Sequence, residues 1–223
     1  MELQESSGGS ADVAEVGFIG GGLAFRFLVA VDAEGFSRCC AAEQASIQDD
    51  LDRALDRAAK VTGMDRARWS CQPRGDGELA ELPLDTDGLS LAGDFPRQLA
   101  VAISEINAAR VAGPRLRVRM AIHHGAVSPG RFGPVGPATV LVTRLLDASV
   151  VRQQLRDQPS RDLALVVSVT VFDEVIRTRF HDLCPEDFAR VTVHTKGVAY
   201  PGYLYQGDFT DTAPQIPAIA AGI

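Results

Sequence analysis

The segment LAFRFLVAVDAEGFS, residues 23–37, decides how the rest of the chain is interpreted. Residues 23–31 form a near-continuous apolar run, which is typical of a central strand covered on both faces. Asp32 follows at the predicted end of this strand, and a small turn from Ala33 to Ser37 comes next. A carboxylate beside outward-pointing backbone N–H groups suits a divalent metal that holds a polyphosphate. An aspartate in this place is also a common turn former or helix cap.

A second aspartate lies in the segment PRGDGEL, residues 73–79. The surrounding sequence RWSCQPRGDGELAELP predicts two strands around a tight Gly75-Asp76-Gly77 turn, which is the D-G form of the hairpin signal. By itself, Asp76 is weak evidence for a metal site, because Asp-Gly is a common hairpin turn. Neighbouring strands lie about 4.8 Å apart, so two strand ends can bring Asp32 and Asp76 onto one cation.

Strands and helices alternate along the rest of the chain. Hydrophobic periodicity predicts helices over residues 46–61, 95–111 and about 138–155, strands over 115–125 and 163–169, and a closing hairpin over 190–206. Ser46 and Asp49 have the spacing of a capping box at the start of the first helix. This order of elements predicts an α/β sandwich with helices packed on a mixed sheet.

The chain has 223 residues, of which 46% are apolar and 23% are charged. That is enough apolar sequence to bury the core of one domain. We expect this domain over residues 17–208. A polar, Ser/Gly-rich flexible segment is expected at 1–16, and a flexible, proline-containing tail at 209–223.

The charge balance and the lack of long apolar runs exclude several function classes. A formal net charge of −7 argues against a general surface for nucleic acid or anionic membranes. No apolar run approaches the ~20 residues that cross a bilayer, and we expect a cytoplasmic protein with no membrane partner. The 4 cysteines show no CxxC spacing, so we expect reduced, mostly buried thiols.

Six segments occur in an order that resembles the class III nucleotidyl cyclase catalytic domain, the adenylate and guanylate cyclase family, over about residues 24–206. They are FLVAVDAEGFS, RGDGELAELP, RVRMAIHHGAV, VGPATVLVTRLLDA, LALVVSVTVFDEV and TKGVAYPGYLY. The resemblance implies a ferredoxin-like α/β sandwich. It also implies a Mg²⁺- or Mn²⁺-dependent enzyme that converts a nucleoside triphosphate to a 3′,5′-cyclic nucleotide and pyrophosphate. In this family the active sites form at a head-to-tail homodimer interface.

The resemblance assigns roles to particular residues on the phosphate side of the site. Asp32 and Asp76 match the two metal-binding aspartates, with the Ala33 carbonyl as a further ligand. The turn at Glu34, Gly35 and Phe36 would lie under the triphosphate. Arg144 matches the transition-state arginine of the family, and Lys196 falls near a lysine that meets the terminal phosphates.

The ribose and base side departs from the family pattern. Val140 stands where the family usually has an asparagine that positions the ribose, and a valine side chain cannot form hydrogen bonds. The two base-selecting places hold Gln72 and Gly133, which match neither the adenine pair nor the guanine pair of the family. The resemblance therefore implies a nucleotide cyclase with non-standard base specificity, for which a pyrimidine nucleotide is one option.

A second interpretation is a catalytically degenerate cyclase homology domain that binds a nucleotide, or only dimerises, as a regulatory module. The changes at Gln72, Gly133 and Val140 favour it. The retention of Asp32, together with Asp76 and Arg144, favours the enzyme.

Two groups of polar residues on the predicted strand at 115–125 have structural interpretations. One of His123 and His124 is expected to face the core and the other the solvent. Arg115, Arg117 and Arg119 alternate onto one strand face, where we expect solvation or pairing with acidic neighbours.

Overall fold

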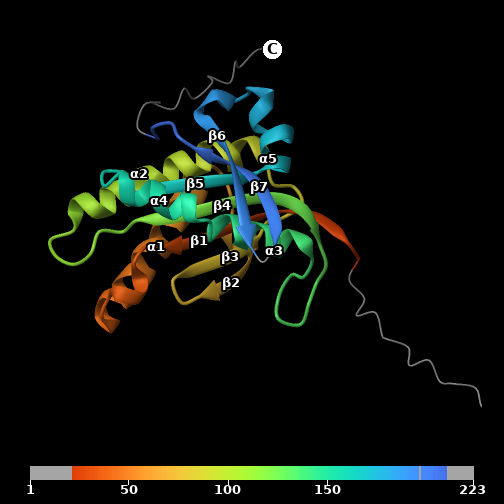
Figure 1. Cartoon of the computed structure of the whole chain (residues 1–223). Helices are drawn as coiled ribbons and strands as arrows, with labels where there is room; N and C mark the ends of the chain where they lie inside the picture. Colours follow the sequence, from red (N-terminus) through yellow and green to blue (C-terminus); the bar gives the residue numbers. More distant parts are fainter. Residues whose placement is uncertain (1–21, 196, 210–223) are drawn as a thin grey trace, which may run out of the picture.

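The computed structural model describes residues 22–195 and 197–209. The expected flexible segment at 1–16, Lys196 and all but the first residue of the expected tail at 209–223 lie outside the described residues. In the described part, seven strands form one sheet in the order β2-β3-β1-β4-β5-β7-β6 (Figure 1). The strands are β1 (Ala24–Ala33), β2 (Ser70–Arg74), β3 (Gly77–Glu81), β4 (Val118–Val127), β5 (Leu163–Ser168), β6 (Phe188–Thr195) and β7 (Val198–Tyr205).

The sheet is mixed, as the sequence predicts. β1 runs antiparallel to both β3 and β4, whereas β4 and β5 are parallel. The hairpin of β2 and β3 forms one edge of the sheet, and the hairpin of β6 and β7 forms the other. The α/β fold class is confirmed.

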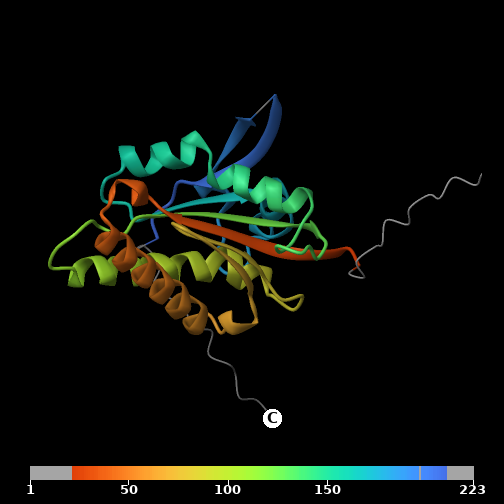
Figure 2. The same cartoon turned by 90° about the horizontal axis from the view of Figure 1, so that it is seen from below.

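Helices cover both faces of the sheet (Figure 2). One face carries α1 (Ala41–Val61) and α2 (Phe95–Ala109), and the other carries α3 (Pro137–Leu146) and α4 (Ser149–Asp157). A short helix, α5 (Val169–Glu174), follows β5. Two hydrophobic clusters fill the space between sheet and helices. Side chains of β1 alternate between them, with Val29 and Val31 under α1 and α2, and Leu28 and Ala30 under α3 and α4.

This alternation explains why β1 is apolar almost throughout. A strand covered on both faces buries every side chain, so it loses the alternating pattern of a half-exposed strand. The same period of two puts Asp32 on the face of α3 and α4. Arg119 of β4, which lies opposite Asp32, shares this face. The candidate site therefore lies on the α3 and α4 side of the sheet.

Two helix boundaries differ from the sequence prediction. α1 begins at Ala41, five residues before the predicted start, and its capping box is formed by Cys40 and Glu43 rather than by Ser46 and Asp49. The single helix predicted from about 138 to 155 is two helices, because Ala148 has an extended backbone that ends the helical path after α3.

Other predictions concern the burial of single residues. His123 is buried and the His124 side chain is 27% exposed, which confirms the expected division between core and solvent. All the cysteines are free, but the expectation that they are mostly buried is wrong, since three are exposed and Cys39 is intermediate. No helix in the described ranges is long and apolar enough to cross a membrane.

Candidate active site

The two candidate metal aspartates come together where β1 ends. Asp32 is the penultimate residue of β1 and pairs in register with Gly77, the first residue of β3. Asp76 precedes Gly77 in the hairpin turn, and its backbone carbonyl accepts a hydrogen bond of 2.8 Å from the Ala33 N–H. The hairpin is therefore fastened to the end of β1 at the residues that carry the carboxylates.

Arg119 holds one oxygen of the Asp32 carboxylate. Its Nη2 donates to Oδ2 at 2.7 Å, and the two side chains are only 11% and 8% exposed. The other oxygen, Oδ1, is buried and has no hydrogen-bond partner among the described residues. Burial raises the pKa of the Asp32 carboxyl to about 7 against the opposing effect of Arg119, and the charge of Asp76 adds to the rise.

This donor set fits a hard divalent cation. A buried, unpaired carboxylate oxygen beside a second carboxylate is unfavourable, and a cation would relieve both the desolvation and the repulsion. Within residues 22–195 and 197–209, no three His, Cys, Asp or Glu side chains gather closely enough to hold a metal alone. Mg²⁺ commonly takes one or two carboxylates together with substrate phosphates and waters. Asp32, Asp76 and the Ala33 carbonyl are what this chain can offer.

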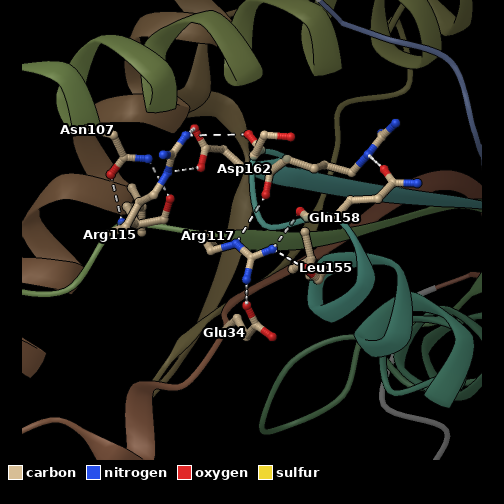
Figure 3. Close-up of polar contacts among 10 residues, drawn as sticks. Glu34, Asn107, Arg115, Arg117, Leu155, Gln158 and Asp162 are labelled. Atoms are coloured by element: carbon tan, nitrogen blue, oxygen red, sulfur yellow. Dashed lines mark hydrogen bonds and ion pairs between the residues drawn. The ribbon is translucent and has the colours of Figure 1, made fainter.

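Glu34, the first residue of the candidate phosphate turn, is neutralised by an ion pair. Arg117 Nη1 lies 2.8 Å from Glu34 Oε2, and both side chains are 18% exposed. Arg117 also donates to the carbonyls of Leu155 and Gln158 near the end of α4 (Figure 3). The pair removes an acidic charge that would repel a triphosphate, and it ties the turn to α4.

The rest of the turn is shaped by Gly35 and Phe36. Gly35 has a φ of 78°, in the left-handed region that favours glycine. Phe36 begins a short 3₁₀ turn, Phe36–Arg38, and its side chain packs against the core cluster beneath α1 and α2. The backbone of Phe36, and not its side chain, therefore lines the turn.

Two glutamines on α1 hold both of the loops that carry the site. Gln44 Nε2 donates to the carbonyls of Phe36 and Cys39, each at 3.2 Å. Gln48 Nε2 donates to the Gly75 carbonyl at 2.6 Å, directly before Asp76. Residues four apart on a helix share one face, so one side of α1 braces the phosphate turn and the hairpin together.

Arg144 and Val140 lie one turn apart on α3. Val140 is 47% exposed, whereas Val142 and Leu145 of the same helix are fully buried. Arg144 is partly exposed and forms no hydrogen bond or ion pair with any described residue. Within one chain, Arg144 is therefore not joined to Asp32. Lys196, between β6 and β7, lies outside the described residues.

Gln72 and Gly133, which are 61 positions apart in the sequence, are in contact. Gln72 Nε2 donates to the Phe132 carbonyl at 2.7 Å. A Cβ atom built on Gly133, whose φ is 111°, would lie 1.0 Å from that nitrogen. The Gln72 amide therefore fills the space of a side chain at position 133. The Phe132 ring beside it is 91% exposed.

The fold has relatives among solved structures, although no protein-family model and no curated protein matches the chain. The guanylyl cyclase Cya2 is 16% identical with a TM-score of 0.59, and the match covers 84% of this chain and 93% of Cya2. The adenylate/guanylate cyclase/hydrolase from Silicibacter pomeroyi is 18% identical with a TM-score of 0.58, over 82% of this chain and 96% of that one. The catalytic core of a rhodopsin-guanylyl cyclase in complex with ATPαS is 14% identical with a TM-score of 0.54, over 83% and 97%.

This chain has the nucleotidyl cyclase fold. The six short segments that resemble the cyclase family predicted this fold, and it is confirmed. The α/β sandwich that the resemblance implied is confirmed as well. The roles of Asp32, Asp76 and Arg144 remain predictions, because a likeness at this level of identity concerns the fold alone.

Within the cyclase fold, sequence reasoning missed the residues that support the aspartates. Arg119 was expected either to be solvated or to pair with an acidic neighbour, and the structure shows that it pairs with Asp32. The alternation of Arg115, Arg117 and Arg119 was the available signal, and each of the three pairs with a carboxylate. Nothing in the sequence pointed to Gln48, because its partner is a backbone carbonyl.

Proposed function

We propose that this protein is a divalent-metal-dependent nucleotide cyclase that converts a nucleoside triphosphate to a 3′,5′-cyclic nucleotide and pyrophosphate. Its active site would form at a head-to-tail homodimer interface. The observation that carries the proposal is the convergence of Asp32 and Asp76, with Asp32 Oδ1 buried and unpaired. A domain that only dimerised would have no need for this unfavourable arrangement.

The chain's own residues would bind the phosphates from one side. Asp32, Asp76 and the Ala33 carbonyl would hold Mg²⁺ or Mn²⁺, which supplies activation of the ribose 3′-hydroxyl and charge neutralisation at the phosphates. The turn at residues 34–36 would lie under the triphosphate, and Lys196 would meet its terminal phosphates. The ion pair between Glu34 and Arg117 supports this arrangement because it leaves no free carboxylate in the turn.

Arg144 of the partner subunit would complete the site. In the proposed reaction the ribose 3′-oxygen attacks the α-phosphorus, the bond from that phosphorus to the bridging oxygen breaks, and pyrophosphate leaves. An arginine at the α-phosphate would stabilise the charge that develops during this in-line displacement. Arg144 has no hydrogen-bond or ion-pair partner among residues 22–195 and 197–209 of its own chain, which supports a role across an interface.

The ribose and base side supports non-standard selectivity. Val140 would leave the ribose without a side-chain hydrogen bond, which would cost on the order of 10²-fold in rate. Gln72 offers an amide in place of a charged selector, and the missing side chain at Gly133 is compensated by that amide. The second candidate function, a degenerate cyclase homology domain that binds a nucleotide or regulates by dimerising, rests on these same three changes.

The first experiment separates the two candidate functions. Purified protein is incubated with each of the four nucleoside triphosphates and Mn²⁺ or Mg²⁺, and cyclic products are sought by mass spectrometry. We expect a 3′,5′-cyclic nucleotide from at least one of them. The catalytic proposal would be refuted if no nucleotide gave a product and none bound in a metal-dependent way. Binding without product would favour the regulatory module.

A complementation experiment tests the shared site. Asp32→Ala and Arg144→Ala should each abolish product formation. An equal mixture of the two variants should recover about a quarter of wild-type activity, because random pairing makes half of the dimers mixed, and each mixed dimer retains one of its two sites. A mixture that stays inactive, while sedimentation shows that subunits exchange, would argue against the split site.

A further inference from the structure

Arg38 is an exposed arginine beside the candidate phosphate turn. It ends the short 3₁₀ turn that follows Gly35, and its backbone N–H donates to the Gly35 carbonyl at 2.9 Å. Its guanidinium forms neither a hydrogen bond nor an ion pair within residues 22–195 and 197–209. By contrast, Arg117 and Arg119, which contact the end of β1 from the neighbouring segment, are both engaged with carboxylates.

The guanidinium of Arg38 lies directly over Gly35. A Cβ atom on Gly35 would be 2.7 Å from Nη2 and 3.3 Å from Cζ of Arg38. The φ of 78° favours glycine at position 35, and the missing side chain lets the guanidinium lie against the turn. The chain thus places a free cation on the surface of the turn over which the triphosphate is proposed to lie.

Two carbonyl oxygens of this turn and its one carboxylate already have hydrogen-bond or ion-pair partners. The Gly35 carbonyl accepts from the Arg38 N–H, and the Phe36 carbonyl accepts from the Cys39 N–H and from Gln44. The Glu34 carboxylate is paired with Arg117. With these acceptors engaged, the uncompensated charge of the turn is that of Arg38, and such a surface attracts a polyphosphate.

We propose that Arg38 binds the terminal phosphates of the nucleoside triphosphate, from the same subunit that carries Asp32 and Asp76. This inference rests on the proposed function in one respect, which is the position of the triphosphate over the turn. It adds a substrate-binding residue that the resemblance to cyclases did not assign, and it supplies a cation on the side of the metal aspartates.

The test measures binding of a probe that needs no base. Isothermal titration calorimetry with inorganic tripolyphosphate and Mn²⁺ is carried out on the full chain, on Arg38→Ala, on Arg38→Lys and on Lys60→Ala. Lys60 is a matched control, because it is an exposed cation in the last turn of α1 that has no partner in the described part of the chain. That turn lies roughly 30 Å along the helix from the phosphate turn. Thermal unfolding checks that each variant is folded.

We expect Arg38→Ala to raise the dissociation constant of the tripolyphosphate by about tenfold or more, since it removes charge-assisted hydrogen bonds. Arg38→Lys should retain part of the affinity as a point charge, and Lys60→Ala should change it less than about twofold. Equal affinities for wild type, Arg38→Ala and Lys60→Ala would overturn the inference. Failure of the wild type to bind the probe would overturn it as well.

Two outcomes distinguish a failure of phosphate binding by Arg38 from a failure of the proposed cyclase function. Tripolyphosphate binding that depends on Arg38, in a protein that makes no cyclic nucleotide, would retain the inference and reject the cyclase. Cyclic product whose rate and KM are the same in Arg38→Ala and wild type would retain the cyclase and reject the inference. In an active enzyme we expect Arg38→Ala to raise KM more than it lowers kcat, because the terminal phosphates are bound before and during the reaction.

Discussion

Asp32 combines two roles that usually conflict. It follows the buried apolar residues 28–31 of a central strand, so its carboxyl is buried and its pKa is raised to about 7. The proposed role as a metal ligand requires an ionised carboxylate, while burial disfavours that charge. Arg119 offsets part of this cost at one oxygen. The proposed cation would relieve the remaining cost.

His123 gives a prediction at the residue scale. Its Nδ1 lies 2.9 Å from the buried Ser168 Oγ, and burial, aided by the charge of His124, lowers the pKa of His123 to about 4. Between pH 4 and 6.5 the unfolded state therefore binds more protons at this residue than the folded state does. The contribution of His123 to the free energy of unfolding must fall as the pH drops through this window, by on the order of 3 kcal/mol.

The measurement is urea unfolding of wild type and of His123→Gln at a series of pH values from 4 to 7. Asp32 acts in the opposite direction, because its raised pKa makes the folded state bind more protons over much of this range. Only the difference between the two proteins isolates His123. The stability of His123→Gln relative to wild type should improve on acidification, and parallel stability curves would contradict the prediction.

At the scale of elements, the β2–β3 hairpin delivers Asp76 to Asp32. The fit between this hairpin and β1 depends on Gly77, where a Cβ atom would lie 1.9 Å from the Val31 carbonyl oxygen and 2.8 Å from the Asp32 Cα. Both neighbours are backbone atoms that cannot rotate away. A side chain at position 77 must therefore separate β3 from β1 beside the two carboxylates.

We predict that Gly77→Ala lowers the free energy of unfolding by about 2 kcal/mol or more. It should also weaken Mn²⁺ binding. Gly75→Ala, two residues away in the same hairpin, is the control: no atom lies within 4 Å of a Cβ built there, so its effect should stay within about 1 kcal/mol. Urea unfolding and Mn²⁺ titration measure both quantities. If the two substitutions had equal effects, the close contact at Gly77 would not be the cause of the lost stability and Mn²⁺ binding.

At the scale of the whole molecule, no hydrogen bond or ion pair joins Arg144 to Asp32 or Asp76 among the described residues of one chain. Asp32 lies near the end of β1 and Asp76 in the β2–β3 turn beside it, whereas Arg144 on α3 has no partner among the described residues of its own chain. If the enzyme works as proposed, only the dimer is active. By mass action, the fraction of the protein that is dimeric depends on the total protein concentration.

We therefore predict that specific activity falls when the protein is diluted below its dimer dissociation constant, and that it recovers on concentration. Analytical ultracentrifugation at the same concentrations gives the fraction of dimer, which should follow the activity. Constant specific activity over a range in which sedimentation shows mainly monomer would rule out the shared site.

Much of the fold could be predicted from local pattern. The apolar run of β1, the D-G turn of the hairpin and the amphipathic stretches gave the element types, because each depends on residues close in the sequence. Boundaries were less accurate. The start of α1 depends on Cys40 and Glu43, an unusual capping pair, and the break between α3 and α4 depends on the backbone of Ala148 rather than on a proline or glycine.

The sequence by itself determined that this chain folds as an α/β sandwich and that two aspartates stand at turns beside strands, and the resemblance of six segments to the cyclases implied which sandwich it is. Hydrophobic periodicity and turn chemistry are local properties, and they can be read without knowing the partners. Only the tertiary structure decided that Arg119 binds Asp32, that Gln72 occupies the space at Gly133, and that Arg38 alone stays free at the phosphate turn. Those relations follow from strand register and loop packing, which join residues far apart in the chain.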